Sequence, residues 1–248
     1  MLKLLILGGT TEASALARAL AGDSRLDAIL SFAGVTNAPR QPPIPWRKGG
    51  FGGVEGLVSY LQNAKIELLI DATHPFATQM KRHAAAASQI AKIPLLAILR
   101  PPWQPESGDR WTIVADMPEA ARALGAAPRR VLLTIGQKDL AAFHAPQHRY
   151  IIRSVDPPVM PPPNAMLITA RGPFDEAEEM ALMTRHGIDI LVTKNSGGTA
   201  TAPKLAAARK LGVAVIMVAR PPPPEMETVP DAEVALRWLN HAAARRGV

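Results

Sequence analysis

The sequence predicts an α/β protein built from two Rossmann-like domains, each with a parallel β-sheet. Along its 248 residues, short runs of branched apolar residues recur. Each run is followed by a turn rich in Gly, Thr, Ser or Pro and then by a stretch rich in Ala and Leu. This alternation is typical of βαβ units. The rhythm begins again after Gly125-Ala126-Ala127-Pro128, so we expect an N-terminal domain at 1–127 and a C-terminal domain at 128–248.

The apolar runs set the expected elements of each domain. In the first domain, strands are expected at 2–7, 27–32, 66–70, 94–99 and 111–114. In the second domain, strands are expected at 131–135, 150–155, 166–170, 188–193 and 213–219. Helices are expected from the first turn to residue 20, through 84–87, and near 118–124, 174–186, 203–211 and 231–245. The proline-rich segments 157–163 and 221–224 exclude helix and predict stiff, extended connectors.

Composition restricts the chemistry. The absence of cysteine excludes disulfides, thiolate metal sites and iron–sulfur clusters, so redox chemistry would need a bound cofactor. The histidines lack metal-ligand spacing, and we expect no metal. No apolar segment approaches the roughly 20 residues that cross a bilayer, and no signal peptide is visible, so we expect a soluble cytoplasmic protein. The net charge of +7 favours an anionic partner, but scattered basic residues without aromatic motifs argue against nucleic acid.

The turn after the first strand is a candidate phosphate site. In open parallel sheets, ligands bind at the carboxyl ends of the strands. Gly8-Gly9-Thr10-Thr11 stands there and supplies backbone N–H groups at a helix start, where a phosphate is stabilised. It differs from the G-x-G-x-x-G pattern because Thr10 occupies the third position and Ala13 the sixth. A tight turn that merely requires two glycines is the alternative.

The end of the second strand favours NADP over NAD. An NAD site usually has Asp or Glu at this place to bind the ribose, whereas here Ser31, Ala33 and Gly34 stand around Phe32. No acid would repel a 2′-phosphate, and Arg40, Arg47 and Lys48 follow closely in the sequence. The alternative is that these cations are exposed loop residues.

The third strand ends in Thr73-His74-Pro75-Phe76, and we expect Thr73, His74 and Phe76 to line the cofactor site. Proline at the first helical position is also an ordinary helix start, so this segment has a purely structural alternative. His74 is a candidate ligand contact or proton donor. No residue is assigned as the catalytic acid.

Cationic and glycine-rich turns follow the strands of the second domain. The candidates for a substrate or cofactor cleft are Gly136, Lys138, Arg171, Lys194, Asn195, Ser196, Gly197, Gly198 and Lys204. A lysine, an amide, a hydroxyl and two glycines after an apolar strand suit a carboxylate or phosphate. Asn-Ser-Gly-Gly is also good turn chemistry. We expect Lys194 to bind the ligand rather than form a structural ion pair.

Several common enzyme classes lack their main motifs. Neither tyrosine has a lysine four residues later, which argues against a short-chain dehydrogenase pair. The chain has no G-x-x-x-x-G-K-[ST] loop and no G-x-S-x-G turn, which argues against P-loop and α/β-hydrolase chemistry.

Taken in order, the motifs resemble those of the precorrin-6A reductase family, which includes cobalt-precorrin-6A reductases. The similar segments are 7–13, 31–34, 49–53, 71–77, 100–103 and 193–198. The resemblance implies that NADPH and a polycarboxylate tetrapyrrole bind in a cleft between the two domains. It also implies hydride transfer to the ring D side of the A–D junction of precorrin-6A, giving precorrin-6B in cobalamin biosynthesis. Val35 departs from the family, which often has Arg there, so the 2′-phosphate contact falls to Ser31, Thr36, Arg40 or a later basic residue.

Some questions stay open at this stage. Whether the substrate carries cobalt and which oligomer forms are not determined by the sequence, and hand-over contacts with neighbouring pathway enzymes are an expectation only. Two other functions fit two Rossmann-like domains. One is a nucleotide-sugar transferase, and the other is a module that senses NADPH without consuming it.

Overall fold

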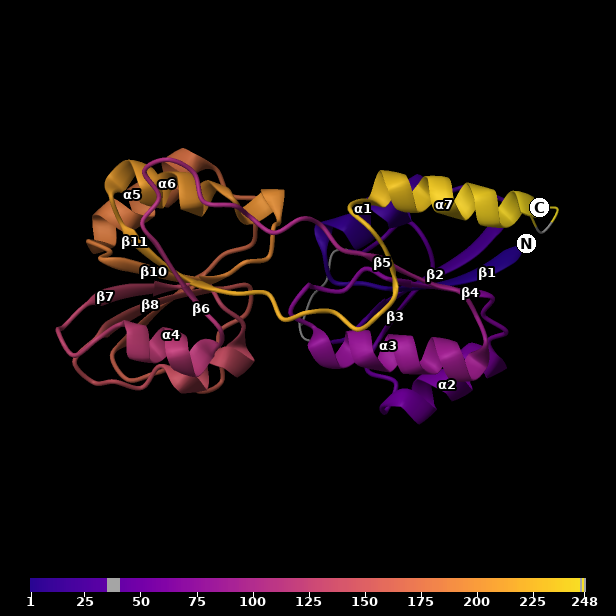
Figure 1. Cartoon of the computed structure of the whole chain (residues 1–248), viewed down its shortest axis with the longest axis horizontal. Coiled ribbons are helices and arrows are strands. Elements are labelled where there is room, and N and C mark those ends of the chain that lie inside the picture. The colour runs from indigo at the N-terminus through magenta and orange to yellow at the C-terminus, as the bar shows by residue number, and fades with distance from the viewer. Residues whose placement is uncertain (35–40, 246, 248) are drawn as a thin grey trace. The chain divides into compact units, whose positions relative to one another are not determined.

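The computed structural model describes residues 1–34, 41–245 and 247 and contains two α/β units (Figure 1). The first unit comprises Met1–Pro101 and Pro221–Val248, and the second comprises Pro102–Arg220. Each unit has one six-stranded sheet in which all neighbouring strands run parallel. The predicted fold class, with two parallel sheets and flanking helices, is therefore confirmed.

The first sheet has the strand order β12-β5-β4-β1-β2-β3. Its strands are β1 (Leu2–Leu7), β2 (Leu26–Phe32), β3 (Trp46–Lys48), β4 (Leu68–Asp71), β5 (Leu95–Ile98) and β12 (Glu227–Val229). Its helices are α1 (Thr11–Ala19), α2 (Val54–Asn63), α3 (Thr78–Ala91) and α7 (Ala232–Arg245). Helices α1 and α7 cover one face, and α2 and α3 cover the other (Figure 1).

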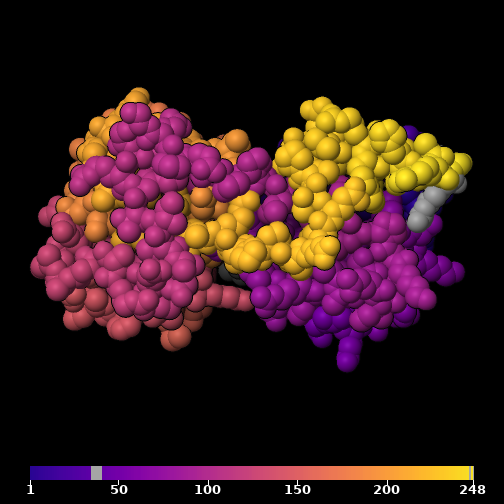
Figure 2. All heavy atoms as spheres, viewed as in Figure 1, coloured from indigo at the N-terminus to yellow at the C-terminus, as the bar shows by residue number. Residues whose placement is uncertain are grey.

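The central strands of this sheet are apolar on both faces because helices cover both. β4 is buried at every position, and β1 at all but one. One face of β1 packs Leu4 and Ile6 with α1 and α7, and the other packs Leu5 and Leu7 with α2 and α3. Figure 2 shows the yellow C-terminal residues of α7 forming an outer layer of this unit.

The second sheet has the order β6-β11-β10-β7-β8-β9. Its strands are β6 (Trp111–Val114), β7 (Arg130–Leu133), β8 (Arg149–Ser154), β9 (Ala165–Thr169), β10 (Ile190–Lys194) and β11 (Ala214–Val218). Its helices are α4 (Met117–Ala123), α5 (Glu176–His186) and α6 (Pro203–Leu211), with 3-10 turns η1 (Gln137–Ala142) and η2 (Thr199–Thr201). Helices α5 and α6 lie on one side and α4 on the other (Figure 1). The central strand β10 is buried through Thr193.

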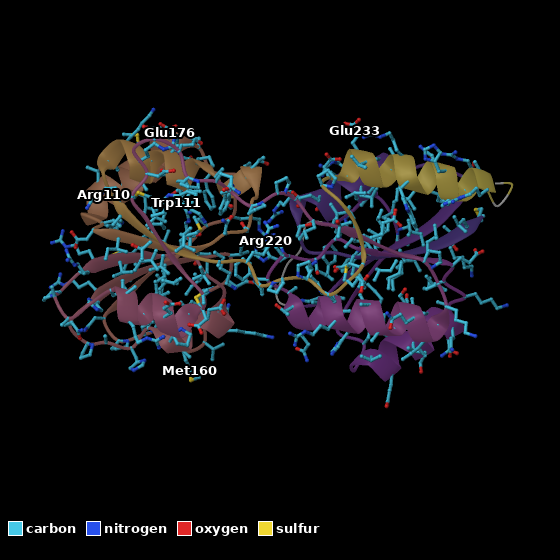
Figure 3. All side chains as sticks on the ribbon, viewed as in Figure 1. Arg110, Trp111, Met160, Glu176, Arg220 and Glu233 are labelled. Carbon is cyan, nitrogen blue, oxygen red and sulfur yellow. The ribbon has the colours of Figure 1, made fainter. Side chains whose placement is uncertain are left out.

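Acidic residues on the covering helices form ion pairs on the protein surface. Glu233 on α7 pairs with Arg237 one turn later, and Glu176 on α5 pairs with Lys210 of α6. Both glutamates point outward in Figure 3. No helix in the described ranges is long and apolar enough to span a membrane.

The domain boundary expected between residues 127 and 128 does not match the division of the structure. The chain passes from the first unit to the second at Pro101 and Pro102, and it returns at Arg220 and Pro221. β6 pairs with β11 of the second sheet, whereas β12 pairs with β5 of the first. A strand pattern does not specify its partner, because pairing is a non-local property, and this is why the sequence rhythm misplaced the boundary.

Helix α2 and the short edge strands β3 and β12 were not predicted from the sequence. Both strands have only three residues, too few for an alternating pattern to show. Helix α2 follows a glycine-rich loop whose Gly52 and Gly53 have φ of 82° and 96°, in the left-handed region. That loop folds back on the helix, since a Cβ added at Gly56 would lie 1.6 Å from the carbonyl oxygen of Phe51.

Gly56→Ala should therefore displace the glycine-rich loop and lower the free energy of unfolding by about 2 to 3 kcal/mol, as overpacking does. Urea unfolding followed by circular dichroism measures the loss. Gly50→Ala is the matched control, because an added Cβ there has no neighbour within 4 Å and φ is not in the left-handed region. Equal stability of the two variants would contradict the close approach at Gly56.

Candidate functional site

Polar groups gather at the carboxyl ends of the strands in each unit. In the first unit, the turn after β1 begins with buried Gly8, whose added Cβ would lie 2.7 Å from Leu30 Cδ1. Gly9 is exposed, has φ of 122°, and has open space where a Cβ would lie. Thr10 caps α1, since its Oγ1 accepts from the Ala13 N–H at 3.2 Å. Packing therefore requires glycine at position 8, whereas the space beside Gly9 at the helix start is open.

Arg47, one of the three cations named from the sequence, lies in β3 beside the end of β2. Arg47 lies in register with Ser31, and its Nη1 donates to Ser31 Oγ at 2.8 Å. Ser31 itself is buried, so its hydroxyl supports the guanidinium. Ala33 is exposed and Gly34 has φ of 86°. The segment that includes Val35, Thr36 and Arg40 lies outside the described residues.

The Arg47 guanidinium is fixed from two further directions. It donates to the carbonyls of Gly49 and Gly50 at 3.0 and 3.2 Å. It also lies over the rings of Phe51 and Tyr60, at 4.1 and 5.2 Å from their centroids. Rings and carbonyls together orient a planar cation beside the end of β2.

The turn after β4 rests on a buried ion pair. Lys81 Nζ lies 3.0 Å from Asp71 Oδ2, and Asp71 Oδ1 accepts from Thr73 N at 2.9 Å and Thr73 Oγ1 at 2.6 Å. Thr73 is buried, whereas His74 and Phe76 are half-buried. His74 Nδ1 accepts from the Phe76 N–H at 3.2 Å, which places the proton of a neutral ring on Nε2.

Two motifs of the first unit are joined by a residue pair that the sequence analysis did not assign. Arg100 Nη1 lies 2.5 Å from Glu12 Oε2, and both side chains are more than four-fifths buried. Glu12 follows Thr11, which is exposed at the start of α1. This ion pair connects the segment after β5 to the first turn of α1.

At the second sheet, Lys194 does form an ion pair, and the expectation to the contrary was wrong. Its Nζ lies 2.5 Å from Asp139 Oδ2, beside Gly136, whose added Cβ would be 4.0 Å from Nζ. The pair arises because η1 starts directly after β7 and brings Asp139 to the end of β10. Both side chains keep about a fifth of their surface exposed, so the pair is not sealed from solvent.

The rest of this turn has a partner in the segment after Arg100. The Asn195 amide donates to the Trp103 carbonyl at 3.0 Å and accepts from its N–H at 2.7 Å. Asn195 thus fixes Trp103, and its side-chain amide is already engaged at both ends. Ser196 and Gly198 are buried and Gly197 is half-buried, while Lys138 and Arg171 are exposed.

Lys204 is buried at the start of α6. Its Nζ donates to Thr134 Oγ1 at 3.1 Å and lies 5.5 Å from the centre of the Trp103 ring. Among the described residues it has no ion-pair partner, because Glu179 pairs with Arg153 at 2.8 Å. Burial, with a smaller contribution from the charge of Arg153, lowers the pKa of Lys204 from 10.5 to about 7; Glu179 opposes the shift.

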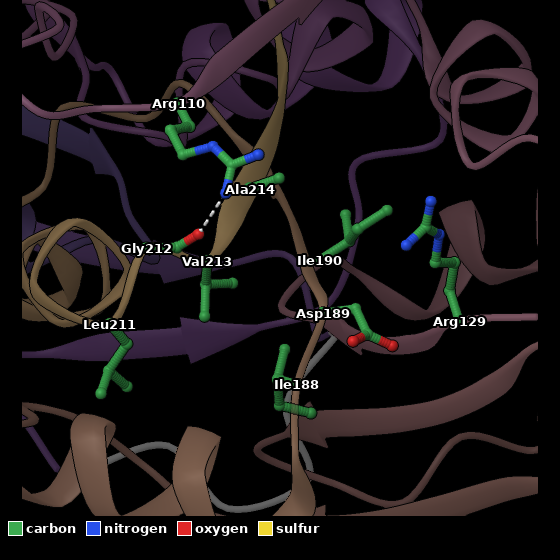
Figure 4. Close-up of a pocket in the computed structure, with 9 residues that line it drawn as sticks. All are labelled: Arg110, Arg129, Ile188, Asp189, Ile190, Leu211, Gly212, Val213 and Ala214. Carbon is green, nitrogen blue, oxygen red and sulfur yellow. Dashed lines mark hydrogen bonds between the residues drawn. The ribbon is translucent and has the colours of Figure 1, made fainter.

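A shallow pocket lies at the opposite ends of β10 and β11 (Figure 4). It is lined by Arg110, Arg129, Ile188, Asp189, Ile190, Leu211, Gly212, Val213 and Ala214. Arg110 donates to the Gly212 carbonyl there at 2.7 Å, and Asp189 accepts from the Arg130 N–H. The pocket is therefore at the amino ends of these strands, away from the motifs described above. Across the described ranges, no group of three acidic or histidine side chains is arranged to hold a metal ion.

Comparison with known proteins identifies the family. The family model described as "Precorrin-6x reductase CbiJ/CobK" matches residues 3–240. The chain belongs to the precorrin-6x reductase family. A precorrin-6A reductase of a Sinorhizobium species is 51% identical over 245 residues, covering 96% of this chain and 93% of the relative. The precorrin-6A reductase of Rhodobacter capsulatus is 47% identical over 252 residues and covers both chains completely.

A solved structure of the same family has the same fold. The structure described as CobK precorrin-6A reductase superimposes with a TM-score of 0.93 at 47% identity, covering 97% of each chain. The family resemblance drawn from the motifs is confirmed. Within this reductase family member, the six motif segments lie at or just after the carboxyl ends of β1, β2, β3, β4, β5 and β10.

The sequence analysis assigned no role to Lys81, although a signal was present. Lys81 stands three residues before Ala84 and six before Ala87, on the buried face of α3. A lysine on the apolar face of a helix indicates a buried acidic partner. Arg153 and Glu179 gave no such signal, because each lies in an ordinary strand or helix pattern.

The pKa of Lys204 predicts how its burial affects stability. The folded state holds this lysine at a lower pKa than the unfolded chain, so the unfolded chain binds more protons between about pH 7 and 10.5. The loss of stability caused by burying the charged lysine is therefore complete below pH 7, and it decreases as the pH rises to about 10.5. Lys204→Met should raise the free energy of unfolding at pH 6 by on the order of 3 to 5 kcal/mol, and this gain should fall to about 1 kcal/mol by pH 10.

Urea unfolding at pH 6, 8 and 10 measures this difference. Lys210→Met on the same helix is the control, since Lys210 is exposed and its surface ion pair should contribute no more than about 1 kcal/mol. A loss of stability in Lys204→Met that is the same at every pH would contradict the lowered pKa.

Proposed function

We propose that this protein is an NADPH-dependent oxidoreductase that converts precorrin-6A to precorrin-6B. Family membership over residues 3–240 supports the reaction class and the tetrapyrrole substrate. The choice of NADPH rests on one observation, the position of Arg47 beside Ser31 at the end of β2. In Rossmann-type sites, an acid at this place binds the ribose of NAD, whereas an arginine nearby accommodates the 2′-phosphate of NADP.

The residues of the first unit fit a dinucleotide. Gly9 leaves open space at the start of α1, where backbone N–H groups and the helix dipole favour a phosphate. Ala33 and Gly34, the two residues that follow β2, carry no bulky side chain. Arg47 offers a planar, oriented guanidinium, which suits a phosphate better than a mobile lysine. We assign NADPH binding to Gly8, Gly9, Thr10, Thr11, Ser31, Ala33, Gly34, Arg47, Thr73, His74 and Phe76.

In this proposal the protein chiefly binds and orients two large ligands. When bound, NADPH supplies a hydride, which we place on the ring D side of the A–D junction of the macrocycle. Thr10 and the N-terminus of α1 hold the pyrophosphate, and Arg47 holds the 2′-phosphate. His74 and Phe76, half-buried after β4, exclude water from the bound nicotinamide.

The substrate carries many carboxylates, and the second unit offers cations for them. Lys194, Lys138 and Arg171 each follow a strand and retain exposed surface. The net charge of +7 would also draw a polyanion toward the protein. We assign the binding of substrate carboxylates to these three residues, with Gly136 and Gly197 allowing close approach.

The reaction is tested by mixing the purified protein with NADPH and precorrin-6A under anaerobic conditions. Loss of NADPH absorbance together with formation of precorrin-6B is expected. A protein that binds NADPH but never oxidises it would be a sensing module, and the proposed reaction would be rejected. Kinetics with NADH equal to those with NADPH would reject the cofactor preference alone.

Arg47→Ala should lower kcat/KM for NADPH by about 10- to 100-fold, the size of a lost charge-assisted contact, and leave kcat/KM for NADH nearly unchanged. The NADH rate serves as an internal measure of intact folding. Arg18→Ala, an exposed arginine on α1, is the control and should alter neither rate. Parallel losses with both cofactors would show that Arg47 only supports the glycine-rich loop.

Lys194→Ala should lower kcat/KM for the tetrapyrrole by roughly 10- to 100-fold with little change in the KM for NADPH. Its effect on the melting temperature should be small, because a partly exposed ion pair contributes about 0 to 1 kcal/mol. Steady-state kinetics and thermal unfolding on one preparation separate the two effects. A large fall in melting temperature with unchanged kcat/KM would assign Lys194 to structure alone.

A further inference from the structure

Asp71 and Lys81 form an ion pair at a position where a buried pair is not expected to stabilise the fold. Their side chains are 0% and 2% exposed, so both charges are removed from water. Lys81 also lies in the first turn of α3, where the helix dipole disfavours a cation. Buried ion pairs of this kind often contribute nothing to stability relative to apolar residues of the same size. A contribution to stability therefore does not explain why charged residues occupy these two positions.

Apart from the bond between them, the side-chain hydrogen bonds of Asp71 and Lys81 to described residues go to Thr73, in the loop after β4. Asp71 Oδ2 accepts from Lys81, and Asp71 Oδ1 accepts from both the N–H and the hydroxyl of Thr73. Lys81 Nζ also lies 3.5 Å from Thr73 Oγ1, which closes a ring of three side chains. The Thr73 N–H and hydroxyl are thus both held by a buried ion pair. His74 follows directly.

Hydrogen bonds of Ala72 connect these three side chains to the glycine-rich turn after β1. Between Asp71 and Thr73, the Ala72 N–H donates to the carbonyl of Leu7 at 2.8 Å. The Ala72 carbonyl accepts from Thr10 Oγ1 at 2.8 Å. Thr10 in turn caps α1. A shift of the backbone at Ala72 would therefore move the start of α1 as well.

From these contacts we infer that Asp71 and Lys81 are positioning residues for cofactor binding. The ion pair holds the loop 72–76, and through Ala72 the turn 8–11, in the geometry that receives the dinucleotide. This inference rests on the proposed function. Neither residue touches the dinucleotide in this account; both act through Thr73 and Ala72.

Two double variants separate positioning from stability. Asp71→Leu/Lys81→Met removes both charges together and also removes the acceptor for Thr73. Asp71→Asn/Lys81→Met removes both charges but keeps an amide oxygen for the Thr73 N–H. Because neither variant leaves an unpaired charge, both avoid the main cause of unfolding in single substitutions. Glu233→Gln/Arg237→Met, an exposed pair on α7, is the matched control.

The readouts are the KM for NADPH, kcat, the KM for precorrin-6A, the Kd of NADP⁺ by calorimetry, and the melting temperature. Asp71→Leu/Lys81→Met should raise the KM for NADPH and the Kd of NADP⁺ by about 10-fold or more, as small misplacements of binding groups do. Its KM for precorrin-6A should stay near the wild-type value. Asp71→Asn/Lys81→Met should show a smaller rise, and the control none.

Wild-type NADPH and NADP⁺ affinity in both double variants would overturn the inference, whatever their melting temperatures, and would leave a structural ion pair. If Asp71→Leu/Lys81→Met does not fold, Asp71→Asn/Lys81→Gln takes its place, because it keeps uncharged hydrogen-bonding groups at both positions. A raised KM for NADPH then supports the inference, and an unchanged KM overturns it. Failure of the wild-type protein to bind NADP⁺ would instead reject the proposed function.

Discussion

Parallel pairing of buried strands is the constraint on which the rest of this structure depends. A parallel strand must be followed by a crossover before the next strand can pair, and helices on the faces of the sheet provide most of these crossovers. Residues 155–164 connect β8 to β9 without a helix. All the carboxyl ends of the strands in one sheet then meet at one edge. Loops that are far apart in the sequence, after β1, β2 and β4, are brought together there. The polar chemistry of each unit is concentrated at that edge because the strands themselves are apolar.

The charged groups at these edges are held in different ways, and the difference matters for function. Lys81 and Arg153 are buried and each has a carboxylate partner, so their charge is balanced. Lys194 has a partner but keeps contact with solvent. Lys204 is buried beside the Thr134 hydroxyl and the Trp103 ring, without a carboxylate partner among the described residues. Burial therefore lowers its pKa. The charges of Lys81 and Arg153 are thus removed from solvent, whereas the charge of Lys194 is not.

The two units are completed by segments that return from elsewhere in the chain. β12 pairs with β5, and α7 packs with α1, so the last residues of the chain finish the first unit. β6 pairs with β11 and finishes an edge of the second sheet. The prolines at 101, 102 and 221 stand at the two passages between the units, where helix is excluded. Neither unit is therefore a continuous stretch of sequence.

The sequence by itself determined the fold class, most of the strands and helices, the family and the places where polar loops follow strands. These are local properties: apolar runs, glycines such as Gly9, and cations such as Arg47 are visible in a single segment. The tertiary structure alone decided which strands share a sheet, and so moved the boundary from 127 to 101. It also decided which groups contact each other. Lys194 pairs with Asp139, Lys81 pairs with Asp71, and the Asn195 amide bonds to the Trp103 backbone. Pairing of strands and of charges depends on distance in space, and one chain read in order does not contain that distance.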